Sequence, residues 1–218
     1  MTVLTGGVKR IGILLFPGVE ELDAVGPWEI LSCWTKYFPG DGFEVFTFSA
    51  DGEPVECAKG MTISPQHDFG AAPGREVLVY PGGRGARALV EEPGHLAWVR
   101  EQRVTTPLIA SVCTGSLVLA AAGLLAGRPA TTHWRSVDRL SALDPTIEVR
   151  PGDRYVDDGD IITAAGVSAG IDMALRLVQR LAGTRRAREV RRIVQYDPEP
   201  PADTEWRAPH DDADASRR

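Results

Sequence analysis

Residues 107–125 read PLIASVCTGSLVLAAAGLL: an apolar run, a small polar turn, and then a run rich in alanine and leucine. The first run, from Leu108 to Val112, has the length and composition of a buried strand, and the second has the composition of a helix. Cys113 lies at the turn between them. A short buried strand that leads directly into a helix is typical of parallel sheets covered by helices.

Cys113 occupies the position of a nucleophile elbow, the sharp strand-to-helix turn that presents a reactive side chain in α/β hydrolases. The free N–H groups and the dipole of the following helix are predicted to lower the pKa of the thiol below its unperturbed value of about 8.5. The alternative is a small buried apolar residue, a common role for cysteine. The position at the turn favours the reactive interpretation, so Cys113 is the candidate nucleophile.

Strands and helices are predicted to alternate along most of the chain. Strands are expected at residues 11–16, 43–49, 77–80, 108–112, 130–132, 147–149, 154–157 and 161–164, with a further strand or hairpin arm at 56–63. Helices are expected at 86–92, 95–104, 167–181 and 185–195, in the alanine- and leucine-rich run after the Cys113 turn, and from His133-Trp134 through about Leu143. A further helix within 20–37 is expected to become regular at Gly26-Pro27. This alternation predicts an α/β fold with a mostly parallel sheet and helices on both faces.

The composition of the 218-residue chain fits one globular domain, assigned to residues 1–196. Hydrophobic residues make up 43% of the chain and charged residues 25%, which is ordinary for a soluble protein. Residues 197–218 are acidic and rich in proline, and we expect a disordered or loosely docked tail. No apolar run reaches the roughly 20 residues of a membrane span, and the N-terminus lacks a signal-peptide pattern. A cytoplasmic protein with no membrane partner is expected.

Charge and cysteine usage exclude further classes of protein. The net charge is −6, and the one dense basic run, at residues 185–192, is predicted to spread around a helix, so no nucleic-acid partner is expected. Cys33, Cys57 and Cys113 lack the Cys-x-x-Cys spacing of zinc sites, and three cysteines do not form a secreted disulfide framework. No glycine-rich nucleotide-binding motif is present. These patterns argue against a metal site and against a phosphate-binding loop.

Three predicted strand ends carry residues suited to chemistry. The strand at 11–16 leads to an acidic segment at 20–23, the strand at 77–80 leads to Pro81-Gly82-Gly83, and the strand at 108–112 leads to Cys113. Reactive groups gather at the carboxyl ends of parallel strands. If these strands are neighbours, an acid, a glycine-opened loop and a thiol meet in one place.

The acidic segment supplies the candidate proton carriers Glu20, Glu21 and Asp23. A carboxyl group beside a thiolate has a raised pKa and can hold a proton for the substrate. Asp23 is flanked by apolar residues and is expected to point inward. Glu20 and Glu21 also fit the alternative of solvated charges at a helix start.

Gly82-Gly83 and His133 each allow two interpretations. The glycines permit close backbone approach, so their N–H groups, together with the amide of Thr114, suit an anion-stabilising hole, but an ordinary turn fits equally. His133 fits either a base for Cys113 or a hydrogen-bonded histidine at a helix start.

Taken together, these segments resemble the DJ-1/PfpI superfamily over about residues 9–195. The resemblance rests on residues 11–23 with Gly26-Pro27, on 81–83, on 111–116 and on 166–172. It implies a flavodoxin-like three-layer sandwich, related to class I glutamine amidotransferase-like domains, that forms a homodimer. Within the superfamily, SVCTGSLVL followed by ATTHW at 130–134 is most similar to isonitrile (isocyanide) hydratases.

The resemblance implies a role for each candidate residue. Cys113 becomes the nucleophile and Asp23 its acidic partner, while the amides of Gly83 and Thr114 line the anion hole, with Glu20 and His133 as possible accessory groups. The substrate is then a small molecule. Water adds to an isocyanide through a Cys113 thioimidate, and an N-substituted formamide is released without a cofactor.

Two other functions stay open at this point. One is glyoxalase- or deglycase-like action on reactive carbonyls, with the same thiol and acid. The other is a ligand or redox sensor related to the sensor domains of AraC-type regulators, in which Cys113 oxidises. Thr114 stands where proteolytic members have histidine, which argues against a peptidase. The short acidic tail stands where the regulators have a helix-turn-helix region, which argues against a transcription factor.

Overall fold

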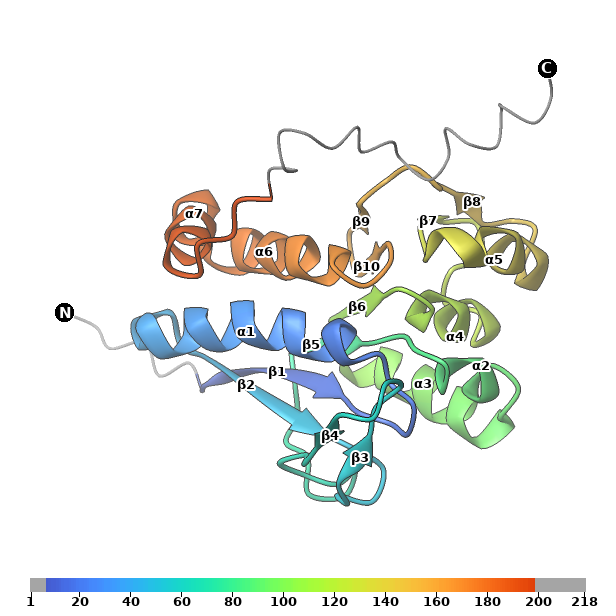
Figure 1. The fold of residues 1–218 in the computed structure, drawn as a ribbon, viewed down its shortest axis with the longest axis horizontal. Coiled ribbons are helices and arrows are strands. Elements are labelled where there is room, and N and C mark those ends of the chain that lie inside the picture. Colours follow the sequence, from blue (N-terminus) through green and yellow to red (C-terminus); the bar gives the residue numbers. More distant parts are fainter. Residues whose placement is uncertain (1–6, 199–218) are drawn as a thin grey trace.

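A six-stranded sheet forms the centre of the computed structural model, which describes residues 7–198 (Figure 1). Its order is β2-β1-β5-β6-β10-β9. The strands are β1 (Lys9–Leu14), β2 (Phe43–Phe48), β5 (Val77–Tyr80), β6 (Leu108–Val112), β9 (Tyr155–Asp158) and β10 (Ile161–Ala164). All neighbouring pairs are parallel except β9 with β10, which places one antiparallel strand at an edge. The predicted mostly parallel sheet is confirmed.

The two central strands β5 and β6 are buried along their whole length. Their sequences, VLVY and LIASV, are the continuous apolar runs that a sheet covered on both faces requires. Both strands have the bounds that the sequence predicts. Their carboxyl ends carry the glycine loop and Cys113.

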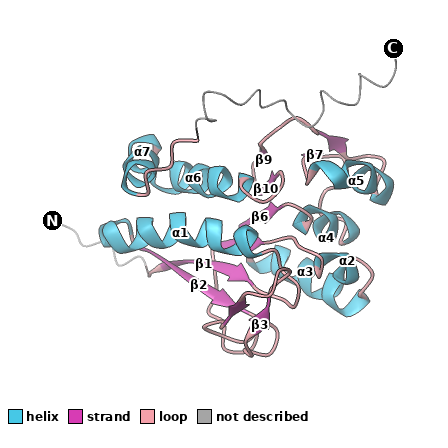
Figure 2. Ribbon diagram, in the orientation of Figure 1, coloured by secondary structure: helices cyan, strands magenta, loops and turns pink. Residues whose placement is uncertain are grey.

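Helices cover both faces of the sheet. One group, α1 (Glu21–Tyr37), α6 (Ala169–Ala182) and α7 (Thr184–Ile193), lies together in the upper part of Figure 2. The others are α2 (Ala86–Leu89), α3 (Pro93–Thr105), α4 (Gly115–Ala121) and α5 (Val137–Leu143), in the lower and right-hand parts. This is the expected flavodoxin-like α/β architecture.

Helix α1 begins earlier than the sequence predicts. Its first residue is Glu21, and Pro27, expected near the start of the regular part, lies inside the helix. Proline has no N–H to donate to the carbonyl of Asp23 one turn before it. Close packing on α6 offsets this loss: a Cβ at Gly26 would lie 3.1 Å from Ile171, and one at Gly170 would lie 3.3 Å from Pro27.

The shorter strands differ from the prediction in length and pairing. The segment expected at 56–63 is an antiparallel hairpin of β3 (Val55–Glu56) and β4 (Thr62–Ile63). The strands expected at 130–132 and 147–149 are β7 (Pro129–Ala130) and β8 (Glu148–Val149), which pair with each other outside the main sheet. Two 3-10 helices, η1 (Pro39–Asp41) and η2 (Trp134–Ser136), complete the described elements.

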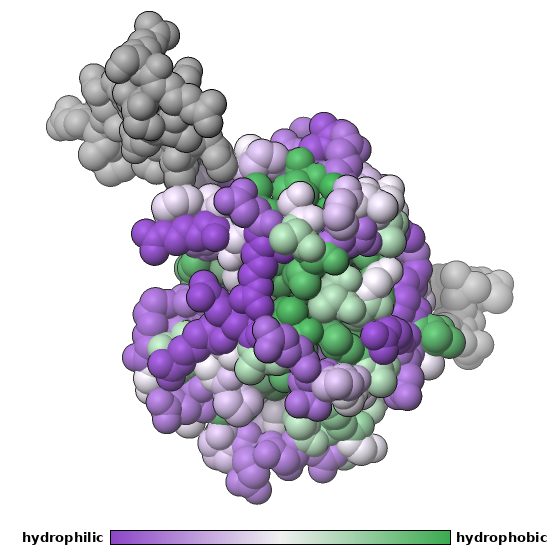
Figure 3. All heavy atoms as spheres, turned by 90° about the vertical axis from the view of Figure 1, so that its right-hand side faces the viewer, coloured by the Kyte–Doolittle hydropathy of each residue, from purple (hydrophilic) through white to green (hydrophobic). Residues whose placement is uncertain are grey.

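The right-hand side of Figure 1, seen face-on in Figure 3, carries a band of hydrophobic residues bordered by hydrophilic ones. Helices α2, α4 and α5 lie on this side, and they and the turn after α4 contribute the partly buried residues Leu89, Ala121, Leu124 and Leu143. No helix in residues 7–198 has the length and apolar character to cross a membrane. Of the tail expected from residue 197, all but Asp197 and Pro198 lies outside the described residues.

Candidate functional site

The acidic segment, the glycine loop and the Cys113 turn meet where the carboxyl ends of three inner strands lie side by side. β1, β5 and β6 are consecutive in the strand order, so the chains that leave their carboxyl ends lie side by side. An isolated bridge between Val19 and Gly83 ties the acidic segment to the glycine loop. The three strands are therefore neighbours, as the meeting of an acid, a glycine loop and a thiol requires.

Cys113 adopts a left-handed backbone conformation, with φ of 55°. A side chain in this region costs on the order of 1 kcal/mol, so the surroundings must hold it there. Its N–H lies 3.1 and 3.0 Å from the carbonyls of Ala164 and Ala165. Its own carbonyl accepts hydrogen bonds from the hydroxyls of Ser116 and Thr132, each at 3.0 Å. Hydrogen bonds to both the N–H and the carbonyl of Cys113 therefore hold the elbow in place.

Val167 is a second strained residue at the site. Its φ is 47°, which is rare for a β-branched side chain. The backbone N–H groups of Val167 and Thr114 both act on the sulfur of Cys113 and lower the pKa of its thiol. The sequence identified the segment 166–172 but not this contact. A glycine just before the residue, Gly166, was the one local signal of unusual backbone.

Asp23 is fully buried next to the thiol. Its Oδ2 accepts a hydrogen bond from the Gly82 N–H at 2.9 Å, and its Oδ1 has no hydrogen-bond partner within residues 7–198. Burial, with a smaller contribution from the charge of Glu20, raises the pKa of Asp23 to about 8 against the opposing Gly82 bond. Asp23 therefore holds a proton at neutral pH, and Oδ1 is the atom free to carry it.

The pKa of the Cys113 thiol is raised, not lowered as the sequence led us to expect. The residue is only 6% exposed, and burial, with the charge of Asp23, raises the pKa of the thiol to about 12. The N–H groups of Thr114 and Val167 oppose this shift. The loss of water around the sulfur raises the thiol pKa more than the N-terminal end of α4 lowers it. The resting pair consists of a neutral thiol and a neutral carboxyl group.

The glycine loop packs directly on the elbow. A Cβ at Gly82 would lie 2.5 Å from the Thr114 nitrogen and 2.9 Å from Asp23 Oδ2, so only glycine fits. The Gly83 N–H donates to Thr114 Oγ1 at 2.9 Å, and that hydroxyl donates to the Gly83 carbonyl at 3.2 Å. The Gly83 N–H is therefore bonded to Thr114 in this structure, and its role in an anion hole with the Thr114 amide stays a prediction. The amide of Gly82, one of the N–H groups considered for the hole, instead donates to the carboxyl group of Asp23.

Glu20 and Glu21 are ion-paired instead of fully solvated. Lys59, in the turn of the β3–β4 hairpin, pairs with Glu20 and lies 3.4 Å from Glu21. The Glu20 side chain is only 15% exposed, and its charge raises the pKa values of both Asp23 and Cys113. Lys59 was missed because no local pattern links it to the acidic segment.

His133 fits the second of its two interpretations. Its Nδ1 accepts a hydrogen bond from the Arg135 N–H at 3.2 Å at the start of η2. In the neutral ring the proton then lies on Nε2, which leaves no lone pair there for a base. Burial and the charges of Arg135 and Arg87 lower its pKa, so the ring is neutral near pH 7. Its edge packs over Gly166, where a Cβ would lie 2.4 Å from Cδ2.

The arrangement offers proton transfer and a nucleophile, and no ligand set for a metal. Within residues 7–198, no group of three or more histidine, cysteine, aspartate or glutamate side chains is placed to hold a metal ion. What the site brings together is a buried thiol, a protonated carboxyl group and a loop that touches both.

Comparisons with known proteins agree with the fold and the motif. The model of the DJ-1/PfpI family matches residues 9–180. Isonitrile hydratase of Pseudomonas putida is 40% identical over 89% of this chain and 82% of its own length. The HTH-type transcriptional regulator CdhR of Pseudomonas aeruginosa is 33% identical over 81% of this chain and 52% of its own. The crystal structure of a THiJ/PfpI family protein from Pseudomonas syringae superposes with a TM-score of 0.79 at 33% identity, covering 96% of this chain and 85% of that one.

Proposed function

This chain belongs to the DJ-1/PfpI family, and from that premise we propose that it is a cysteine-dependent hydratase that converts isocyanides into N-substituted formamides. The observation that carries the proposal is the pairing of a protonated, buried Asp23 with the buried thiol of Cys113. A proton donor and a nucleophile side by side suit a substrate carbon that must receive both. The 40% identity to an isonitrile hydratase supports the same substrate class.

The first step adds the thiol to the terminal carbon of the isocyanide. The sulfur of Cys113 forms the new S–C bond while Asp23 Oδ1 delivers its proton to the same carbon. The carboxylate takes up the thiol proton as the bond forms, so Asp23 returns to its neutral state. The product is a thioimidate, R–N=CH–S, and one S–H has added across the carbon.

The second step hydrates that carbon and releases the enzyme. Asp23 donates its proton to the nitrogen and accepts one from the attacking water, which leaves a tetrahedral R–NH–CH(OH)–S adduct. The C–S bond then breaks, a C=O bond forms, and the hydroxyl proton returns to the departing sulfur through Asp23. The formamide R–NH–CHO leaves and both side chains are restored.

The tightness of the site favours this substrate over a carbonyl compound. Cys113 is 6% exposed, and the loop at Gly82 lies in contact range of Thr114 and Asp23. An isocyano group is linear and presents its carbon end-on, whereas a dicarbonyl carries substituents in the plane of each carbon. A narrow path to the sulfur admits the linear isocyano group more readily than the dicarbonyl.

The test is an ultraviolet assay of formamide formation from aryl and alkyl isocyanides. We expect turnover by the wild-type chain, none by Cys113→Ala, and retained turnover by Cys33→Ala, which alters a buried cysteine on α1. No turnover above Cys113→Ala with any isocyanide contradicts the proposal. Methylglyoxal consumption that depends on Cys113 would then favour a glyoxalase, and peroxide oxidation confined to Cys113 would favour a sensor.

We further propose that the active form is a homodimer that uses the face of α1. A cavity of about 430 Å³ beside α1 is lined largely by apolar side chains, including Val25, Trp28 and Met61. Met61 is 50% exposed and Leu22 on α1 is 37% exposed. Light scattering coupled to size exclusion should give twice the chain mass, and Met61→Glu should lower it. A monomer at micromolar concentration contradicts this assignment.

A further inference from the structure

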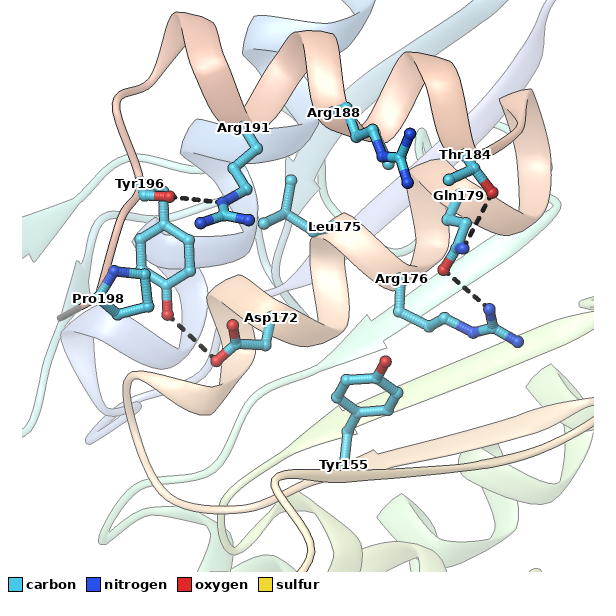
Figure 4. A pocket seen from close by; sticks show the side chains of 11 residues that line it. Tyr155, Asp172, Leu175, Arg176, Gln179, Thr184, Arg188, Arg191, Tyr196 and Pro198 are labelled. Carbon is cyan, nitrogen blue, oxygen red and sulfur yellow. Dashed lines mark hydrogen bonds between the residues drawn. The ribbon is translucent and has the colours of Figure 1, made fainter.

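A second cavity, of about 360 Å³, lies between α6 and α7 and shares no residue with the Cys113 site (Figure 4). Its apolar lining comes from Leu175 and Ala187, and Tyr155 and Tyr196 contribute phenol rings. Three arginines, Arg176, Arg188 and Arg191, also line the cavity. Its volume falls within the usual range for small-molecule pockets, roughly 300–1,000 Å³.

The carboxylates near this cavity are already occupied. Asp172 accepts hydrogen bonds from Arg154 at 2.8 Å and from the Tyr196 hydroxyl at 3.1 Å. Arg176 donates to Asp157 at 2.7 Å and to Gln179 at 2.9 Å. These bonds fix the Arg176 side chain against α6 and leave no free negative charge on that wall.

The α7 side of the cavity carries unbalanced positive charge. Helix α7 has five arginines and a single glutamate, Glu189, which pairs with Arg185 and Arg186. The guanidinium groups of Arg188 and Arg192 have no hydrogen-bond or ion-pair partner among residues 7–198. They lie one turn apart on the same helix face. In Figure 4, Arg188 projects from α7 toward α6, on the side of the cavity that Arg191 also borders.

This wall already accepts an oxyanion from the chain itself. Arg191 donates to the carboxylate of Asp197 at 2.5 Å and to the Tyr196 carbonyl at 2.9 Å. These contacts fix the Arg191 guanidinium at the rim, next to the unpartnered Arg188. Guanidinium groups bind phosphate and carboxylate through paired N–H donors. On a helix face that is only solvated, the arginine side chains would point into solvent and would not line a cavity.

We propose that the cavity between α6 and α7 binds a phosphate monoester that carries an aromatic ring. The phosphate lies against Arg188 and Arg191, with Arg192 adding positive charge at the outer edge. The ring lies on Leu175 and Tyr155, where apolar area and a phenol face are available. The unpaired guanidinium of Arg188 and that of Arg191, which already holds the Asp197 carboxylate, supply the positive charge that faces the phosphate.

The test is isothermal titration calorimetry of the full chain with phenyl phosphate at low ionic strength. We expect one site per chain, with affinity reduced at least about tenfold in Arg188→Ala, because a charge-assisted hydrogen bond is lost. Arg185→Ala is the matched control, since Arg185 lies on the same helix, is 88% exposed and is absent from the cavity wall. Cys113→Ala should bind as wild type does, which separates this cavity from the thiol site.

Companion titrations separate the parts of the ligand. Inorganic phosphate and benzoate should each bind more weakly than phenyl phosphate, and Tyr155→Ala should weaken phenyl phosphate while leaving inorganic phosphate unchanged. Equal affinity for phenyl phosphate and inorganic phosphate overturns the proposal. So does an equal loss in Arg185→Ala and Arg188→Ala, or no heat with phenyl phosphate at millimolar concentration. Thermal melts of each variant verify that the fold is retained.

Discussion

The hydroxyl of Thr132 donates a hydrogen bond at 3.0 Å to the main-chain carbonyl of Cys113. This bond joins the elbow to the segment that continues into His133 and η2, nineteen positions along the chain. The Ser116 hydroxyl donates to the same carbonyl, so a strained peptide is held by two donors.

Replacing Thr132 with valine keeps the shape of the side chain and removes one of these two donors. We expect the free energy of unfolding to fall by about 1 kcal/mol, the usual net value of one hydrogen bond. The carbonyl keeps Ser116, so the loss stays modest. Urea unfolding measures it, with Thr105→Val as control because that hydroxyl is exposed. A change no larger than in the control would show that Thr132 does not support the elbow.

Asp23→Asn should flatten the dependence of stability on pH. The pKa of Asp23 is raised from 3.8 to about 8 in the folded state, so between these values the folded chain holds a proton that the unfolded chain has lost. The contribution of Asp23 to the free energy of unfolding is fully present below about pH 4. It declines as pH rises, by up to about 1.4 kcal/mol per pH unit. Urea unfolding of both proteins at pH 5, 6.5 and 8 gives the two slopes. Parallel slopes would mean that Asp23 does not titrate in this way.

The same proton should control activity. Wild-type turnover of an isocyanide is expected to fall as pH rises past about 8, since Asp23 then loses the proton that the first step uses. Asp23→Asn should remove most activity, by at least about 100-fold, the usual contribution of a general acid. Its circular dichroism spectrum should match that of the wild type. Near-wild-type turnover in this variant would remove Asp23 from the mechanism.

Gly82→Ala should disrupt the contact between the glycine loop and the elbow. The added Cβ would lie 2.5 Å from the Thr114 nitrogen, so the loop must shift away from Asp23 and the elbow. We expect a loss of roughly 1–3 kcal/mol in stability, as for overpacking, together with loss of turnover. Gly74→Ala is the matched control, because nothing lies within 4 Å of its Cβ. Similar melting temperatures for the two variants would contradict the close approach.

Lys59→Gln should shift the pH profile of turnover upward. Lys59 pairs with Glu20 and its charge lowers the pKa of Asp23, so its removal raises that pKa and moves the high-pH limb to higher pH. The shift should stay below about one pH unit, because an exposed ion pair contributes at most about 1 kcal/mol. Lys36→Gln, on the last turn of α1, is the control. A shift to lower pH, or an equal shift in both variants, would contradict the role of Lys59.

The sequence predicts the centre of the fold better than its periphery. Strands β5 and β6 have their predicted bounds because uninterrupted apolar runs bounded by turn residues leave few alternatives. The start of α1 was wrong because Pro27 is a local signal for a helix start, and packing of Gly26 and Pro27 against α6 overrides it. Tertiary contacts of this kind leave no mark on local composition.

At the site, the sequence identified residue types and the structure corrected their states. The pKa of Cys113 moves opposite to the prediction because burial is a property of the assembled fold, whereas the helix start is visible locally. Lys59 reaches Glu20 from a hairpin about forty positions away. The Gly83 N–H donates to Thr114, a contact that depends on the spacing of two loops.

Burial makes the Cys113 thiol less reactive in the folded chain than in the unfolded chain. In the unfolded chain this thiol has an ordinary pKa near 8.5, whereas the completed sheet raises it to about 12. Because β1, β5 and β6 are far apart in sequence, that protection arises only once the long-range strand pairs have formed. Newly made or heat-damaged molecules therefore alkylate and oxidise faster than native ones, and thiol labelling at Cys113 reports how much of a preparation is correctly folded.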